Sequence, residues 1–167
     1  MNFLGLAPRD ADPRRARYVV WPVPYEATVS YRAGTREGPA AIITASRQVE
    51  LYDADLGREI HHPGVATLDP VDPIASSPAA MVEALERTAR PVVGRGRFLI
   101  TLGGEHTVSL GPIQALARRR KLTVLQIDAH LDMRESYQGS PYSHACVMRR
   151  VRELALPTVS VGIRSIS

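Results

Sequence analysis

The chain of 167 residues contains a single cysteine, Cys146. One thiol cannot build an intramolecular disulfide framework, which excludes the class of small secreted domains held together by disulfides. The chain begins without a basic leader or an apolar segment of signal-peptide length, and no apolar run is long enough to span a bilayer. We therefore expect a cytoplasmic protein with no membrane partner, and we expect Cys146 to be a small core residue.

Lysine and aromatic residues are also scarce. Lys121 is the only lysine, so the net charge of +4 comes from arginine, and aromatic residues make up only 5% of the chain. The basic clusters at 118–121 and 149–152 fall where predicted helices end or face solvent, and a helix dipole favours cations near its C-terminus. Few aromatic side chains are available to stack on bases. The composition therefore argues against nucleic acid as a partner.

Apolar runs alternate along the chain with helical patterns. Strands are predicted at 18–23, 65–68, 97–102, 122–127 and 158–163, and helices at 38–49, 78–90, 112–120 and 143–154. Strands separated by helices imply right-handed crossovers and a parallel sheet with helices on both faces. The sequence thus predicts a three-layer α/β fold, and the length fits one domain.

The most informative motif lies where one predicted strand ends. Asp128, His130 and Asp132 follow the apolar run at 122–127, and residues two apart in a strand share one face. In a fully extended chain Asp128 and Asp132 would lie roughly 13 Å apart, too far to share one ion. Either the chain curls after His130, or the three side chains serve two adjacent ions. Carboxylate oxygens with one imidazole suit Mn²⁺ or a similar divalent metal.

A second motif, Gly103-Gly104-Glu105-His106, follows the preceding strand. Paired glycines let the backbone turn sharply and pass close to a ligand. In parallel sheets, ligands gather at the carboxyl ends of the strands. We therefore predict that His106 is a further metal ligand and that Glu105 is a supporting charge. His61 and His62 have no partner at ligand spacing, and we predict that both lie at the surface.

Several separated motifs occur together in one order. They are Pro24 to Thr35, Gly38 to Ile42, Val49 to Asp53, the Gly103 and Asp128 motifs, and Ser140 to Cys146. This set resembles the ureohydrolase family (arginase, agmatinase and relatives) and is most similar to agmatinase. The resemblance covers nearly the whole chain.

The resemblance implies the family's fold and a dinuclear Mn²⁺ centre. In this fold a parallel sheet is flanked by helices on both faces. Ureohydrolases hydrolyse a guanidinium group to urea and an amine, using water activated between two Mn²⁺ ions. By resemblance, His106 and Asp132 would bind one ion, His130 would bind the other, and Asp128 would bridge them. The complete enzyme is expected to be a homo-oligomer.

The resemblance also implies a proton carrier and a substrate class. His144 matches the family's proton-carrying histidine, although Ala145 stands where the family usually has glycine. Arginases hold an asparagine, which helps bind the substrate's α-carboxylate, at the position of Arg134. Its absence indicates a small cationic guanidino substrate, agmatine, which would yield putrescine for polyamine biosynthesis. Alternatively, Arg134 binds the carboxylate of another guanidino or formimino acid.

Two family features are missing from the chain. Ureohydrolases complete their metal site with a later Asp-x-Asp motif and contact the guanidinium with a late glutamate, yet no aspartate follows Asp132. We therefore expect residues 1–167 to be the N-terminal part of a single ureohydrolase domain, inactive on its own. The alternative is a non-catalytic metal-binding fragment or one half of a split assembly.

Overall fold

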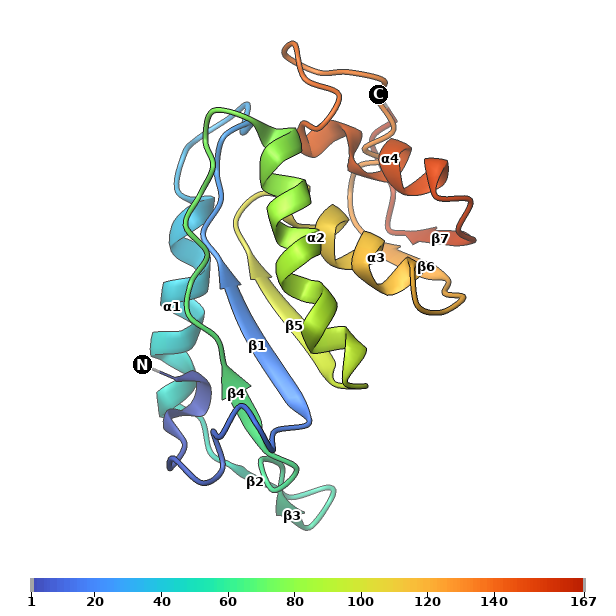
Figure 1. The fold of residues 1–167 in the computed structure, drawn as a ribbon. Helices are drawn as coiled ribbons and strands as arrows, with labels where there is room; N and C mark the ends of the chain where they lie inside the picture. Colours follow the sequence, from blue (N-terminus) through green and yellow to red (C-terminus); the bar gives the residue numbers. More distant parts are fainter. Residues whose placement is uncertain (1, 167) are drawn as a thin grey trace.

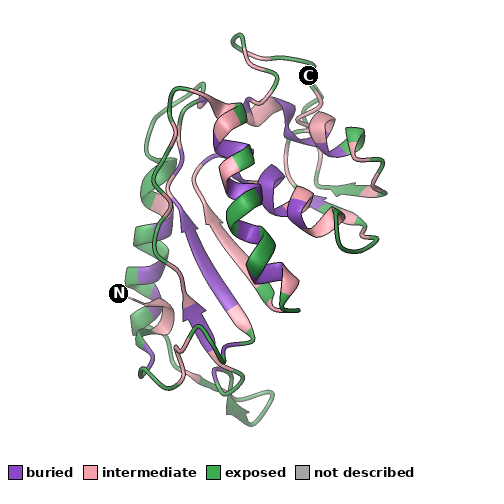
Figure 2. Cartoon of the chain, in the orientation of Figure 1, coloured by how far each residue is buried: buried purple, intermediate pink, exposed green. Residues whose placement is uncertain are grey.

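The computed structural model describes residues 2–166 and contains a parallel sheet in the order β4-β1-β5 (Figure 1). The central strand β1 (Tyr18–Val23) pairs with β4 (Val65–Thr67) on one side and with β5 (Phe98–Gly103) on the other. Because β1 has neighbours on both sides, it is buried along nearly its whole length, whereas β5 is only partly buried (Figure 2).

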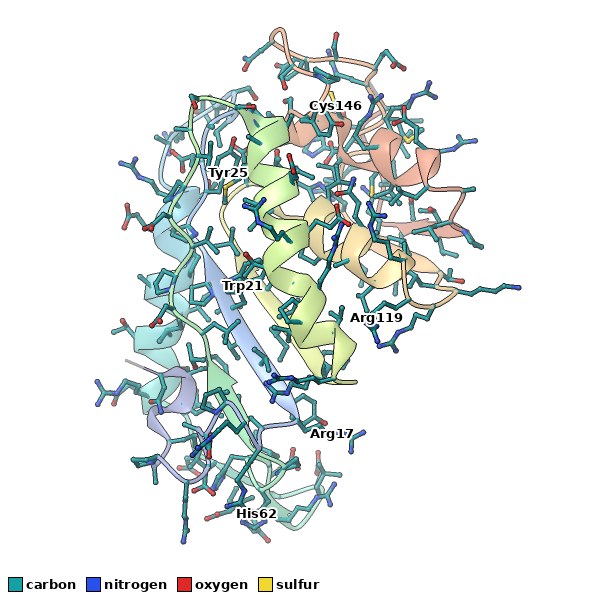
Figure 3. The ribbon with its side chains drawn as sticks, viewed as in Figure 1. Arg17, Trp21, Tyr25, His62, Arg119 and Cys146 are labelled. Carbon is teal, nitrogen blue, oxygen red and sulfur yellow. The ribbon has the colours of Figure 1, made fainter. Side chains whose placement is uncertain are left out.

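Helices cover both faces of this sheet. Alternate side chains of β1 point to opposite sides, and both sets are apolar, so both faces need to be covered. Trp21, labelled in Figure 3, packs with Leu85 of α2 (Pro78–Gly94) and Ala115 of α3 (Leu110–Ala117). On the other face Val20 packs with Leu6, and α1 (Gly38–Ala45) lies beside Pro22. The predicted three layers are confirmed.

The last two strands form a sheet of their own. β6 (Val124–Ile127) and β7 (Thr158–Val161) pair in parallel, but β6 does not pair with β5 in the described part of the chain. The alternation of strands and helices predicted a single sheet, because it reveals which strands exist but not which strands are neighbours. One face of the second sheet packs through Val124 against α3 and α4 (Val147–Glu153). Its other face exposes four apolar side chains, Leu125, Ile127, Val159 and Val161.

The helices differ from their predicted bounds at the ends. α2 continues past Pro91 to Gly94, although proline in a helix interior removes a hydrogen bond. Pro91 lies on the exposed side, and the buried side chains of Val92 and Val93 continue the apolar stripe of the helix. α3 and α4 are each preceded by a 3₁₀ turn, η4 (His106–Ser109) and η5 (His144–Cys146). The other 3₁₀ turns are η1 (Phe3–Gly5), η2 (Thr35–Glu37) and η3 (Ser46–Gln48).

A short antiparallel hairpin, β2 (Tyr52–Asp53) and β3 (Arg58–Glu59), lies before β4. The turn that follows it corrects one prediction, because His61 is only 7% exposed rather than at the surface. His62 is exposed, as predicted. Among residues 2–166, the structure contains no helix with the length and hydropathy needed to cross a bilayer.

Candidate metal centre

The loop after β5 carries His106 into place through Gly104. A Cβ atom on Gly104 would lie 2.1 Å from the carbonyl oxygen of Tyr25, so only glycine fits there. The amide of Glu105 donates a 2.9 Å hydrogen bond to the same oxygen. The glycine pair predicted a close approach to a ligand, but at Gly104 the close approach is to the backbone of Tyr25, just after β1, and it fixes the loop that carries His106.

The chain curls after β6, which is one of the two arrangements left open by the sequence. Asp132 has a φ of +50°, in the left-handed region. The side-chain amide of Gln126 donates to the carbonyl of His130 at 2.9 Å, inside the curl. The carbonyl of Asp132 accepts the amide of Met148 at 3.0 Å, at the start of α4. Asp132 is thus turned back toward β5 instead of extending away from Asp128.

The curl gathers three donor side chains at one point. Nδ1 of His106 lies 2.5 Å from Oδ2 of Asp132 and 3.5 Å from Oδ2 of Asp128. One ligand atom from each of these residues lies within 4.8 Å of the others. Donors that share one octahedral ion at about 2.1 Å lie about 3 Å apart. The 3.5 Å separation is close to this value, whereas the 2.5 Å contact is a hydrogen bond between His106 and Asp132. The three side chains are grouped closely enough to be candidate ligands of one hard divalent cation.

His130 faces the opposite oxygen of Asp128. Nδ1 of His130 is 3.7 Å from Oδ1 of Asp128, whereas Oδ2 faces His106. The two oxygens of one carboxylate are therefore directed at two imidazoles, as a carboxylate bridging two ions requires. The side chain of His130 is 63% exposed, so its half of the centre is the more open one.

The protonation state of Asp128 suits a ligand. Burial tends to raise the pKa of its carboxyl, but the hydrogen bond from the His130 amide and the nearby His106 outweigh burial. The pKa of Asp128 therefore lies below its ordinary value, so the oxygens are available as anionic donors at neutral pH.

Glu105 is occupied by protein donors and is not placed as a ligand. Its carboxylate is 4% exposed and accepts hydrogen bonds through both oxygens. Oε2 accepts the amides of Ala27 and Thr28 at 2.8 and 2.7 Å. Oε1 accepts the hydroxyls of Thr28 and Thr107 at 2.6 and 2.7 Å. This agrees with the expectation that Glu105 supports the site without binding metal.

Thr28 connects Glu105 to His144. The hydroxyl oxygen of Thr28 accepts the backbone amide of His144 at 2.9 Å and lies 3.1 Å from its Nδ1. Because the hydroxyl hydrogen of Thr28 is directed at Glu105, its oxygen can only accept a hydrogen from Nδ1. Oγ of Ser143 lies 3.3 Å from the same nitrogen and can also accept from it. We assign the hydrogen of neutral His144 to Nδ1 on the ground of the shorter Thr28 contact, which leaves Nε2 free to exchange a proton.

All five predicted site residues line one open hollow of about 330 Å³. They are His106, Asp128, His130, Asp132 and His144. The opposite wall includes Tyr31 from the segment between β1 and α1. Glu26 holds that segment in shape, because its carboxylate accepts hydrogen bonds from the hydroxyl of Thr35 and the amides of Gly34 and Arg36. These bonds lower the pKa of Glu26.

The sequence alone did not identify Thr28 as part of the site. It lies 116 residues before His144, and no periodic pattern connects the two.

The structure also gives the surroundings of Arg134 and Cys146, two residues discussed from the sequence. The guanidinium of Arg134 lies 4.7 Å from the centroid of the Tyr137 ring, a cation–π contact. Cys146 is fully buried, as predicted, and burial raises the pKa of its thiol.

Comparisons with known proteins show the family to which the chain belongs. The sequence model of the arginase family matches residues 16–167. The N(1)-aminopropylagmatine ureohydrolase of Synechocystis sp. is 46% identical over 158 residues, which cover 90% of this chain and 52% of that protein. The agmatinase of Pyrococcus horikoshii is 35% identical, over 92% of this chain and 54% of that protein.

A solved structure shares the whole fold. The agmatine ureohydrolase of Thermoplasma volcanium is 34% identical and matches with a TM-score of 0.87, covering 100% of this chain and 56% of that chain. The chain thus spans about half the length of the curated relatives and the solved structure that it matches.

Proposed function

Because the chain belongs to the arginase family, we propose that the complete protein is a ureohydrolase acting on a small cationic guanidino compound. One observation carries the proposal: the five residues singled out from the sequence line a single hollow at the carboxyl ends of β5 and β6. The reaction adds water across the guanidinium carbon and releases urea and an amine.

The donor set fits two Mn²⁺ ions. His106 and Asp132 would hold one ion, His130 the other, and Asp128 would bridge them through its two oxygens. When bound, such ions lower the pKa of water enough to make it a nucleophile at neutral pH. That chemistry is needed because a guanidinium is resonance-stabilised and a poor electrophile.

His144 acts as the proton carrier in this proposal. Its Nδ1 is held by Thr28, so Nε2 is the atom that donates a proton to the departing amine. Histidine suits the step because its ordinary pKa lies near neutral pH. The carboxylate of Glu105 holds Thr28 in the orientation that allows this.

In this proposal, residues outside the chain of 167 complete the centre. Four side chains supply only part of two coordination shells, and two close dications repel strongly without bridging negative charge. We therefore expect the chain alone to bind at most one Mn²⁺ weakly and to release no urea. Elemental analysis and a urea assay on residues 1–167 test this expectation. Two tightly bound ions together with turnover would show that the ligand set is wrongly assigned.

Two substrates of the proposed class are candidates. The sequence motifs favour agmatine, which would be converted to putrescine. N(1)-aminopropylagmatine is the second candidate, because the similar proteins of Synechocystis sp. and Thermococcus kodakarensis are named for it. Both candidates carry a guanidinium at one end of a chain and a primary amine at the other, and neither carries a carboxylate.

The decisive experiment compares substrates on the complete, Mn²⁺-loaded protein. We expect kcat/KM for agmatine or N(1)-aminopropylagmatine to exceed that for arginine by more than tenfold, which corresponds to about 1.4 kcal/mol. A tenfold preference for arginine or a guanidino acid would reject the substrate class and retain the reaction. The absence of urea from every guanidino compound would favour the non-catalytic alternative.

We also propose that the complete protein is a cytoplasmic homo-oligomer. The single, fully buried cysteine is compatible with a reducing compartment. Light scattering on the complete protein tests the oligomeric state.

A further inference from the structure

We propose that His61, His62 and Glu59 form a second divalent-metal site, of the kind that binds Zn²⁺, with Asp10 at its edge. The three residues lie at the end of β3 and in the turn that follows it. Figure 3 places His62 at the end of the molecule opposite Cys146, which is two residues from His144. The proposed site is therefore separate from the candidate metal centre and does not depend on the proposed reaction.

The spacing of the donor atoms matches a tetrahedral ion. Nε2 of His62 is 3.3 Å from Oε2 of Glu59, and Nε2 of His61 is 3.6 Å from the same oxygen. Oδ2 of Asp10 lies 4.0 Å from Nε2 of His61. Tetrahedral Zn²⁺ with ligands at about 2.0–2.1 Å holds its donor atoms about 3.3 Å apart. The three contacts lie at ion-pair distance and are not hydrogen bonds. The imidazole and carboxylate groups therefore face one another at distances that leave room for an ion between them.

His61 is buried, and its Nε2 is directed at two carboxylates. Its side chain is 9% exposed, and in residues 2–166 its Nδ1 has no hydrogen-bond partner. Its Nε2 is directed at the two carboxylates without a hydrogen bond to either. A buried imidazole with an unbonded nitrogen is costly. A metal ion on Nε2 would hold this buried side chain in place between the two carboxylates.

The backbone holds these side chains in fixed positions. The carbonyl of His61 accepts the amide of Gly64 at 2.8 Å, closing the turn that carries both histidines. Gly64 has a φ of +79°, and a Cβ there would lie 2.9 Å from Cα of Ala16, so the turn is pressed against the start of β1. The carbonyl of Asp10 accepts the amide of Val65 at 2.9 Å, which ties the N-terminal segment to β4. The donors thus come from a preorganised frame.

The chemistry of the donors selects the ion. Two imidazoles and a carboxylate are a common Zn²⁺ set, and Asp10 or water can take the fourth position. One cation competes, because Nε of Arg9 lies 3.2 Å from Oδ2 of Asp10, although the Arg9 side chain is 84% exposed. Asp10 is therefore the edge of the site, and the ion would fasten the β2–β3 hairpin to the start of β4.

Co²⁺ is the probe, because its visible absorption distinguishes tetrahedral from octahedral coordination. The experiment uses a variant of the complete protein with Asp128→Asn and Asp132→Asn, two substitutions chosen to disable the candidate metal centre. We expect one Co²⁺ per chain with intense tetrahedral bands, displaced by Zn²⁺. Adding His62→Asn should weaken the affinity for Co²⁺ at least tenfold. His62 is the residue of choice because its side chain is 67% exposed, so its replacement leaves the core intact.

Asp55→Asn, in the same hairpin but outside the cluster, is the matched control and should leave binding unchanged. Circular dichroism checks that each variant is folded. Loss of the tetrahedral bands with His62→Asn but not with Asp55→Asn supports the site. The proposal is overturned if the parent variant keeps no Co²⁺, if its spectrum is octahedral, or if His62→Asn binds as tightly as the parent.

Discussion

The hydroxyl of Thr28 donates a 2.6 Å hydrogen bond to Oε1 of Glu105, although the two residues are 77 positions apart in the chain. The same oxygen of Thr28 accepts from His144, so the buried carboxylate sets the orientation of the candidate proton carrier without touching it. Three segments meet here: the end of β1, the loop after β5 and the turn before α4.

Removing the Thr28 hydroxyl should lower turnover. In Thr28→Val, of similar shape, Nδ1 of His144 loses the nearer of its two hydroxyl partners, and the longer 3.3 Å contact to Oγ of Ser143 remains. We expect kcat to fall at least tenfold, with KM and bound Mn²⁺ unchanged. The loss is smaller than the factor of about 10²–10⁴ that a general acid–base group contributes to the rate, because His144 itself remains. Thr28→Ser keeps the hydroxyl and should restore most of kcat. Equal losses of kcat in both variants would contradict this role.

Asp128→Ala should abolish both metal loading and turnover of the complete protein. Its two oxygens face His106 and His130, so its loss affects both halves of the centre. Elemental analysis of Mn²⁺ beside a urea assay measures the two effects together. Retention of two ions in Asp128→Ala would show that this carboxylate is not the bridge.

His144→Ala should separate metal binding from turnover. Because the side chain bonds to Thr28 and is not placed among the metal donors, bound Mn²⁺ should be unchanged. We expect kcat to fall by about 10²–10⁴, since the departing amine loses its proton donor. A parallel loss of Mn²⁺ would assign His144 to the metal centre instead.

Glu86 should make stability depend on pH. This buried carboxylate on α2 bonds to Arg90 at 2.7 Å and to Arg118. Burial tends to raise the pKa of Glu86, but the two guanidinium groups outweigh burial and lower it. A lowered folded-state pKa stabilises the fold above the unfolded value of about 4.3, and this contribution is lost as pH falls through the folded pKa.

Glu86→Gln should therefore reduce the free energy of unfolding by about 1 kcal/mol at pH 7. The effect is no larger because both arginines are at least half exposed, so solvent screens the ion pairs. The difference from the parent should shrink as pH falls below 4. Urea unfolding at several pH values measures it. Glu83→Gln, on the exposed side of the same helix, is the control. A difference independent of pH would point to packing.

Residues 1–167 expressed alone should self-associate. β6 and β7 expose apolar side chains on one face, with Ile127 80% exposed and Leu125 61% exposed, and unpaired strand edges favour nonspecific pairing. Ile127→Thr should reduce the association measured by light scattering without lowering the melting temperature. A monodisperse monomer of the parent chain with a sharp melt would contradict this expectation.

Much of the site could be predicted because it depends on local pattern. The apolar runs before His106 and Asp128 identified two strand ends, and both ends line one hollow although β5 and β6 belong to separate sheets. The resemblance to ureohydrolases, read from separated motifs, is confirmed by the arginase-family match over 16–167. The three-layer architecture followed from alternation of strands and helices alone.

Other features depended on contacts between distant segments. The burial of His61 results from packing of its turn against Ala16 and β4, which no spacing near His61 encodes. The division into two sheets was equally hidden, because strand order is a property of the assembled chain.

The sequence by itself determined the strand ends, the candidate donor residues and the family, since these are carried by hydrophobic periodicity and residue identity along a short stretch. Only the tertiary structure decided that Asp132 curls back toward His106, that each oxygen of Asp128 faces a different histidine, and that Thr28 orients His144. The physical reason is range: periodicity reports on the nearest few residues, whereas a metal centre is set by angles and distances of a few ångströms between segments that only packing brings together.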